Sequence, residues 1–152
     1  MGLGLDEDKA REAEQARAVE ANYRTLSIIW LAILASVIGI FVITRVLGPM
    51  PSVLTFIFWI LFAIGIANFG ASFLLKRLLV NQAVTKRKPE LVRGAYLIAF
   101  ALCESIGLLG LVAHLITGVE QYYFFFVLSG FGILIHKPQR DDILSASSAT
   151  GT

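Results

Sequence analysis

The chain alternates between long apolar blocks and short charged segments. Charged residues are absent from 25–44, 46–75 and 121–136, and the block 94–119 contains a single one, Glu104. At about 1.5 Å per helical residue, a block of about 20 residues matches a hydrocarbon core of about 30 Å. The blocks mix Leu, Ile, Ala, Phe, Val and Gly without two-residue alternation, which excludes the strands of a membrane barrel. The pattern therefore predicts an all-α integral membrane protein.

We expect four transmembrane helices in an antiparallel bundle. Two short connections, at 48–51 and 118–121, predict that helices consecutive in sequence are neighbours, and the two prolines of the first cannot continue a helix. The membrane domain covers residues 26–136, and its helices are expected at about 26–46, 53–77, 92–117 and 121–136.

The two chain ends are polar. Residues 1–25 are charged and rich in strong helix formers, which predicts a cytoplasmic helix that approaches or runs into the first span. The last residues are small and polar, so 137–152 is expected to be a flexible cytoplasmic tail.

The distribution of basic residues predicts the orientation. Of the 13 Lys and Arg, four precede the first span, six flank the central connection 78–91 and two follow the last span. Only Arg45 lies on the opposite side, where its long side chain reaches the interface. Because cytoplasmic loops carry the excess of Lys and Arg, both termini and the central connection are expected in the cytoplasm.

The composition of the chain limits the classes of function that it can have. Hydrophobic residues make up 57% of the chain and charged residues 16%, with a net charge of +2 and a single cysteine, Cys103. The chain has no metal-ligand spacing, nucleotide-binding loop or nucleophile with a base, and we expect no enzyme, cofactor, metal or nucleic-acid partner. Of the two histidines, His114 is expected to be interfacial or packed, and His136 to contact headgroups.

Glu104 is the candidate functional residue. It lies about ten residues into the span that starts at Gly94, hence about 15 Å deep and close to the bilayer midplane. An ionised carboxylate at that depth costs several kcal/mol, so such residues usually face a partner helix or water. We therefore expect Glu104 either to remain protonated or to bind a partner.

Small and polar residues suggest what Glu104 meets. Asn68 lies at a similar depth in the second span among small residues, so we hypothesise that its amide contacts Glu104. Ser105 either bonds to its own helix or helps to bind a cation. Gly107 lies on the same face as Glu104, where it lets another helix approach closely.

One stretch resembles a known family. Arg87-Lys-Pro-Glu-Leu91, followed by Ala101-Leu-Cys-Glu104-Ser-Ile-Gly-Leu108, resembles the second half of the proteolipid c subunit of rotary ATP synthases. The resemblance covers residues 87–112 and, more weakly, 63–72. It implies that Glu104 is the carboxylate that binds the transported proton or sodium ion, with Ser105 among the ligands.

These observations lead to two expected functions. The first is a small membrane subunit that binds a proton or cation at Glu104, with Asn68 and Ser105 as further ligands, within a homo-oligomer or a complex with other membrane subunits. The alternative is a non-transporting accessory or scaffold subunit in which the carboxylate holds helices together. In either case the bilayer is the immediate partner, and a bacterial inner membrane is the expected location.

The orientation is testable by labelling. Single cysteines introduced at Ser145 or near Gln82 should react with impermeant thiol reagents only from the cytoplasmic side, and one at Pro51 only from outside, because of the charge asymmetry. The opposite labelling pattern would overturn the orientation.

Overall fold

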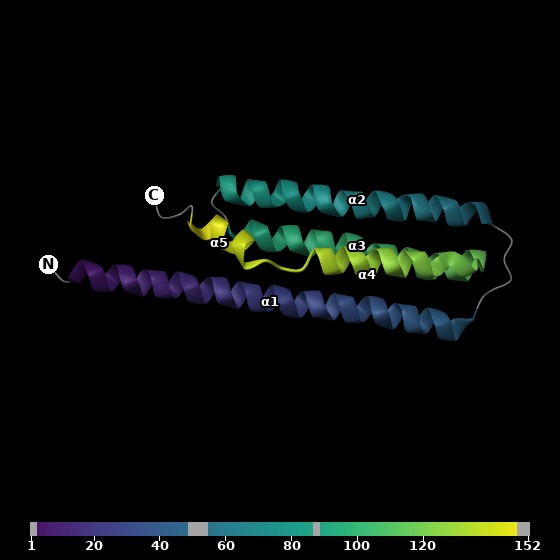
Figure 1. Ribbon diagram of the computed structural model, residues 1–152, viewed down its shortest axis with the longest axis horizontal. Coiled ribbons are helices and arrows are strands. Elements are labelled where there is room, and N and C mark those ends of the chain that lie inside the picture. The colour runs from purple at the N-terminus through teal and green to yellow at the C-terminus, as the bar shows by residue number, and fades with distance from the viewer. Residues whose placement is uncertain (1–2, 49–54, 87–88, 149–152) are drawn as a thin grey trace.

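The computed structural model describes residues 3–48, 55–86 and 89–148, and all regular structure within them is helical (Figure 1). The expectation of an all-α fold is confirmed. Four long segments run along one axis, and a short fifth helix covers one end of the bundle. We call this end the α5 end, and the opposite end, which carries Gly48 and Gly118, the loop end. The elements are α1 (Leu3–Leu47), α2 (Thr55–Lys86), α3 (Pro89–Thr117), the 3-10 turn η1 (Glu120–Tyr122), α4 (Tyr123–Ile135) and α5 (Arg140–Ser148).

Three helices are long and apolar enough to cross a membrane. The qualifying segments are Ala16–Leu47, Thr55–Lys86 and Leu91–Thr117. The fourth expected span, 121–136, is instead a 3-10 turn followed by the 13-residue helix α4. At 1.5 Å per residue α4 is about 20 Å long, short of a hydrocarbon core of about 30 Å.

Two helices extend beyond their expected limits. The charged N-terminal segment is continuous with the first span, so α1 is one helix of 45 residues that projects past the α5 end (Figure 1). The second helix continues to Lys86, so most of the expected connection 78–91 is helical. Residues 78–86 contain neither glycine nor proline, and nothing in them stops a helix.

The third helix occupies the centre of the bundle. It packs against α1, α2, α4 and α5, whereas the backbones of α1 and α2 make no contact within the described residues. Figure 1 shows α3 and α4 between them. The expectation that consecutive helices are neighbours therefore holds for α2–α3 and α3–α4 but is wrong for α1–α2. A short connection limits the separation of two helix ends, but it does not decide which helix fills the space between them.

Two glycines bring α3 and α4 together. A Cβ added at Gly110 would lie 2.7 Å from Phe125 Cβ, and one at Gly132 would lie 2.7 Å from Cys103 Sγ. No side chain fits at either position without displacing the partner helix. Gly118, with a positive φ of 58°, ends α3 and allows the chain to return as η1 and α4.

The C-terminal segment differs from the flexible tail that the sequence predicts. Residues 140–148 form α5, which packs on α1, α2 and α3. Ile143 is buried in a cluster with Leu26 and Phe100, and the Tyr96 hydroxyl donates a 2.6 Å hydrogen bond to Asp142 Oδ2. The same hydroxyl accepts a 3.1 Å bond from the backbone N–H of Gln139. One buried tyrosine therefore holds the start of α5 against the bundle.

Removing this hydroxyl should release α5. We expect Tyr96→Phe to lower the free energy of unfolding in detergent by about 1–2 kcal/mol, because Gln139 and Asp142 lose a buried partner. Amide hydrogen exchange in 140–148 should become faster. The control is Tyr123→Phe, because Tyr123 is 45% exposed. Exchange in α5 that matches the parent protein would show that the hydroxyl does not hold this helix.

Candidate functional site

Glu104 lies near the middle of α3 and faces α1. The Ser36 hydroxyl of α1 donates a 2.8 Å hydrogen bond to Glu104 Oε1. The Glu104 side chain is partly buried, so it is neither enclosed in the core nor fully open. The carboxylate therefore has a partner within the chain, and this partner lies on the first helix rather than on the second.

Ser105 faces the opposite neighbour, α2. The Asn68 amide nitrogen donates a 3.1 Å hydrogen bond to Ser105 Oγ. The Ser105 hydroxyl in turn donates a 2.7 Å bond to the Leu102 carbonyl of its own helix. The expected bond of Ser105 to its own helix is therefore confirmed, and the same hydroxyl also joins α3 to α2. Its expected role in binding a cation stays a prediction.

The hypothesis that Asn68 contacts Glu104 is wrong. Within the described residues no hydrogen bond joins the two, because Asn68 bonds to Ser105 and Glu104 bonds to Ser36. Glu104 and Ser105 are consecutive on α3 and therefore differ by about 100° around the helix axis. They lie at nearly the same depth but face different helices. The structure thus brings Asn68 and Ser105 together but leaves Glu104 on another face.

Cys103, the residue before Glu104, links α3 to a third helix. Its backbone carbonyl accepts a 2.6 Å hydrogen bond from Ser129 Oγ of α4, and its side chain is buried against Gly132. The three consecutive residues 103–105, which we call the polar layer, are therefore linked to α4, α1 and α2 in turn. One short stretch of α3 holds all three neighbouring helices by hydrogen bonds.

The polar layer is better suited to hydrogen bonding than to holding a metal ion. Among the described residues, the Ser36 hydroxyl is the one group that forms a hydrogen bond with the Glu104 carboxylate. Ca²⁺ and Mg²⁺ take six or more oxygen ligands. The described part of the chain contains no group of three or more His, Cys, Asp or Glu that could hold a metal. A serine hydroxyl can donate to a carboxylate or accept from a protonated carboxyl group. The arrangement accommodates Glu104 in either state.

Both histidines are buried. His114 is 4% exposed, lies 2.9 Å from the Gly48 carbonyl through Nε2 and packs on the Tyr122 ring, which agrees with a packed histidine. His136 is 1% exposed, with Nδ1 2.7 Å from the Gly132 carbonyl and its ring 4.5 Å from that of Phe73. The expectation that His136 contacts headgroups is wrong, because its side chain is buried and packs against Phe73 of α2.

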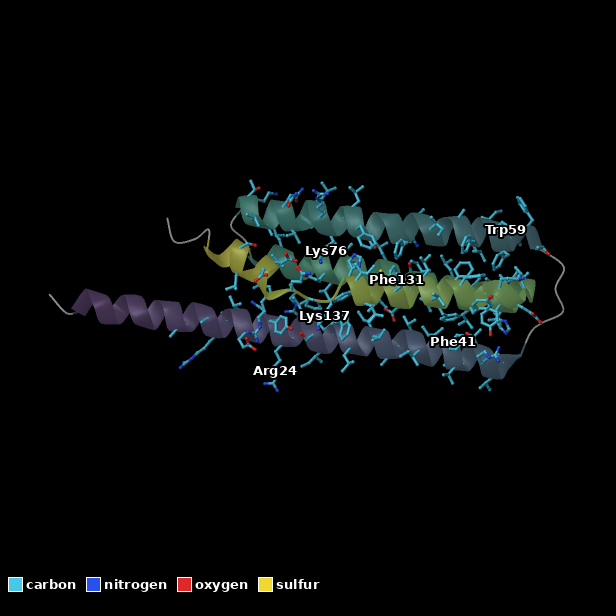
Figure 2. All side chains as sticks on the ribbon, viewed as in Figure 1. Arg24, Phe41, Trp59, Lys76, Phe131 and Lys137 are labelled. Atoms are coloured by element: carbon cyan, nitrogen blue, oxygen red, sulfur yellow. The ribbon has the colours of Figure 1, made fainter. Side chains whose placement is uncertain are left out.

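A charged group at the α5 end was not foreseen. Lys76 Nζ lies 3.9 Å from Asp142 Oδ2 and 4.2 Å from the centre of the Tyr96 ring. Figure 2 shows Lys76 toward this end of α2 and Trp59 at the loop end of the same helix. In the sequence, Lys76 and Asp142 are only charged residues near the ends of apolar blocks, and Tyr96 is only an aromatic residue. Their convergence depends on the docking of α5.

No protein-family model, curated protein or solved structure matches this chain. The resemblance of residues 87–112 to the proteolipid c subunit therefore remains a sequence-based prediction.

The packing around Gly107 gives a test of the polar layer. A Cβ at Gly107 would lie 3.4 Å from Ser129 Oγ and 3.6 Å from Val37 Cγ1, so this glycine faces α4 and α1, not α2. We expect Gly107→Leu to force these helices apart and to lower the free energy of unfolding in detergent by about 1–3 kcal/mol. Gly70→Leu is the matched control, because no atom lies within 4 Å of its Cβ position. Equal stability of the two variants would contradict the packing described here.

Proposed function

We propose that this chain is an accessory or scaffold subunit of a membrane complex, in which Glu104 joins helices and carries no ion. The observation that carries the proposal is the use of the polar layer. Residues 103–105 each make a hydrogen bond to a different helix of the same chain. Polar groups in hydrocarbon are costly unless they are paired, and the pairing here is structural.

The surface of the bundle supports a membrane location. Large apolar side chains are exposed on the two outer helices, including Ile28 and Val46 on α1 and Phe56 and Trp59 on α2. Exposed apolar area of this extent suits lipid or another membrane helix. We place the protein in a bacterial inner membrane with the α5 end toward the cytoplasm, because 12 of the 13 Lys and Arg belong to that side.

The projecting part of α1 supports a role in assembly. It extends past the α5 end as a continuous helix (Figure 1), and Glu14 and Arg17 are exposed on it. The exposed ion pair of Arg140 with Glu20, at 2.9 Å, lies where this arm leaves the bundle. A helical arm that extends past its own bundle and exposes charged side chains such as Glu14 and Arg17 presents a surface for another subunit or a second copy of the chain.

The second candidate function is proton or cation binding at Glu104. It is favoured by one observation: Glu104 Oε2 has no hydrogen-bond partner among the described residues, and the side chain is only partly buried. A carboxyl group with one free oxygen has room for an exchangeable proton. The Asn68–Ser105 pair is then a structural link beside it and not part of the binding group.

Substitution of Glu104 distinguishes the two functions. Gln keeps the shape and an acceptor oxygen for Ser36, so for a scaffold Glu104→Gln should change stability by less than about 1 kcal/mol. Glu104→Ala should cost about 1–3 kcal/mol, because it leaves a gap and removes the bond. The measurement is unfolding in detergent, together with proton and sodium flux in reconstituted vesicles.

The control for the flux assay is Glu120→Gln, because Glu120 is an exposed carboxylate at the loop end. The scaffold function predicts the same flux for the parent and for both Gln variants. A proton or sodium flux that is present in the parent and in Glu120→Gln but lost in a stably folded Glu104→Gln would overturn the scaffold function and establish the second candidate.

A further inference from the structure

An apolar groove runs along the bundle between α1 and α4. Its volume is about 490 Å³, and its walls include Leu34 and Phe41 from α1 and Val127 and Gly130 from α4. Figure 2 shows Phe41 at the α4 side of α1, where its ring packs on that of Phe126. From Leu34 to Arg45 the groove extends over 11 residue steps of α1, or about 16 Å, which is about half the thickness of a hydrocarbon core. Its length therefore suits one acyl chain of one leaflet.

A polar cavity opens at the loop end of this groove. Its volume is about 340 Å³, and its walls include Arg45, His114 and Glu120. Arg45, Tyr122 and Tyr123 line both the cavity and the groove, so the two spaces meet at these side chains. A cavity with charged walls that continues into an apolar groove fits an amphiphilic ligand. The headgroup of this ligand would lie in the cavity at the helix ends, and its apolar chain would lie in the groove.

His114 lines the cavity but offers no open hydrogen-bonding atom to it. A carbonyl can only accept, so Nε2 carries the proton that is donated to the Gly48 oxygen at 2.9 Å. The other ring nitrogen, Nδ1, has no partner among the described residues, but it is buried and closed to solvent. The Thr44 hydroxyl is also occupied, because it donates to the Ile40 carbonyl at 2.7 Å. The groups left to bind a headgroup are therefore the charged side chains of the cavity.

The charges of the cavity are of both signs. Arg45 and Glu120 line it, both are exposed, and neither forms an ion pair within the described residues. A purely anionic headgroup would leave Glu120 against a like charge. A zwitterionic headgroup places its phosphate at Arg45 and its cation at Glu120.

We propose that the groove and cavity bind one phospholipid with an ethanolamine headgroup. The phosphate accepts hydrogen bonds from Arg45, the primary ammonium donates to the Glu120 carboxylate, and one acyl chain fills the groove between α1 and α4. A choline headgroup has the same charges but no N–H, so it cannot donate a hydrogen bond to Glu120. The inference requires the chain to lie in a bilayer, but it does not depend on the role of Glu104.

The test uses the purified full chain in detergent, with native mass spectrometry to count bound lipid. The probes are dioleoyl phosphatidylethanolamine, phosphatidylcholine and phosphatidylglycerol. We expect the ethanolamine lipid to bind about tenfold more tightly than the other two, because hydrogen bonds to charged groups are worth about that factor. Glu120→Gln should remove most of the preference over the choline lipid.

Two glycine variants separate the groove from general effects on the helices. A Cβ added at Gly130 or Gly70 meets no atom of a neighbouring helix within 4 Å, so both positions are open where a side chain begins. Gly130→Leu fills the groove and should weaken the binding of the ethanolamine lipid about tenfold at unchanged melting temperature, whereas Gly70→Leu on α2 should bind like the parent. Equal affinity for the three lipids, a preference for the glycerol lipid, or parent-like binding by Gly130→Leu would overturn the proposal. So would a change of oligomeric state in Gly130→Leu without a change in lipid binding, because a second copy would then occupy the groove.

Discussion

The close approach of α3 and α4 is the constraint on which the rest of the bundle depends. Gly110 and Gly132 leave no side chain between the helices, and Ser129 Oγ then reaches the Cys103 carbonyl at 2.6 Å. With α4 fixed on one face of α3, the next two positions turn toward other helices. Glu104 meets α1 and Ser105 meets α2. In hydrocarbon, polar groups at these positions would need partners within the protein, and the three hydrogen bonds of α3 supply them.

The sequence predicts the helical class correctly, because this class depends on local properties, and the same properties single out Glu104 as a candidate. The length of an apolar block and a charge within it can be read without knowing any contact. The partner of Glu104 could not be predicted in this way. Depth along a helix follows from counting residues, but the direction in which a side chain faces depends on packing. Ser36 is a small uncharged residue in an apolar span, and nothing in its surroundings marks it as the partner.

The C-terminal helix is a second feature that local sequence could not predict. Residues 145–152 are small and polar, which is typical of a tail, and only the pair Ile143-Leu144 precedes them as apolar residues after Asp142. Ile143 is the buried one of the two. Its burial depends on a site built by three other helices. The bond from Tyr96 to Asp142 joins residues 46 positions apart, so no local pattern contains it. The docked α5 also brings Asp142 to 3.9 Å from Lys76 Nζ, so the environment of this border residue cannot be read from its own segment.

The lack of contact between α1 and α2 has a consequence for synthesis. A chain that emerges from the ribosome in order presents these two helices first, and their backbones make no contact with each other in the finished fold. Ser36 and Asn68 both bond to α3, which is made later. Until α3 is made, neither Ser36 nor Asn68 has the hydrogen-bond partner that it has in the finished fold. Assembly of this protein therefore waits for its second half, and a chain terminated after α2 lacks the helix that joins its parts.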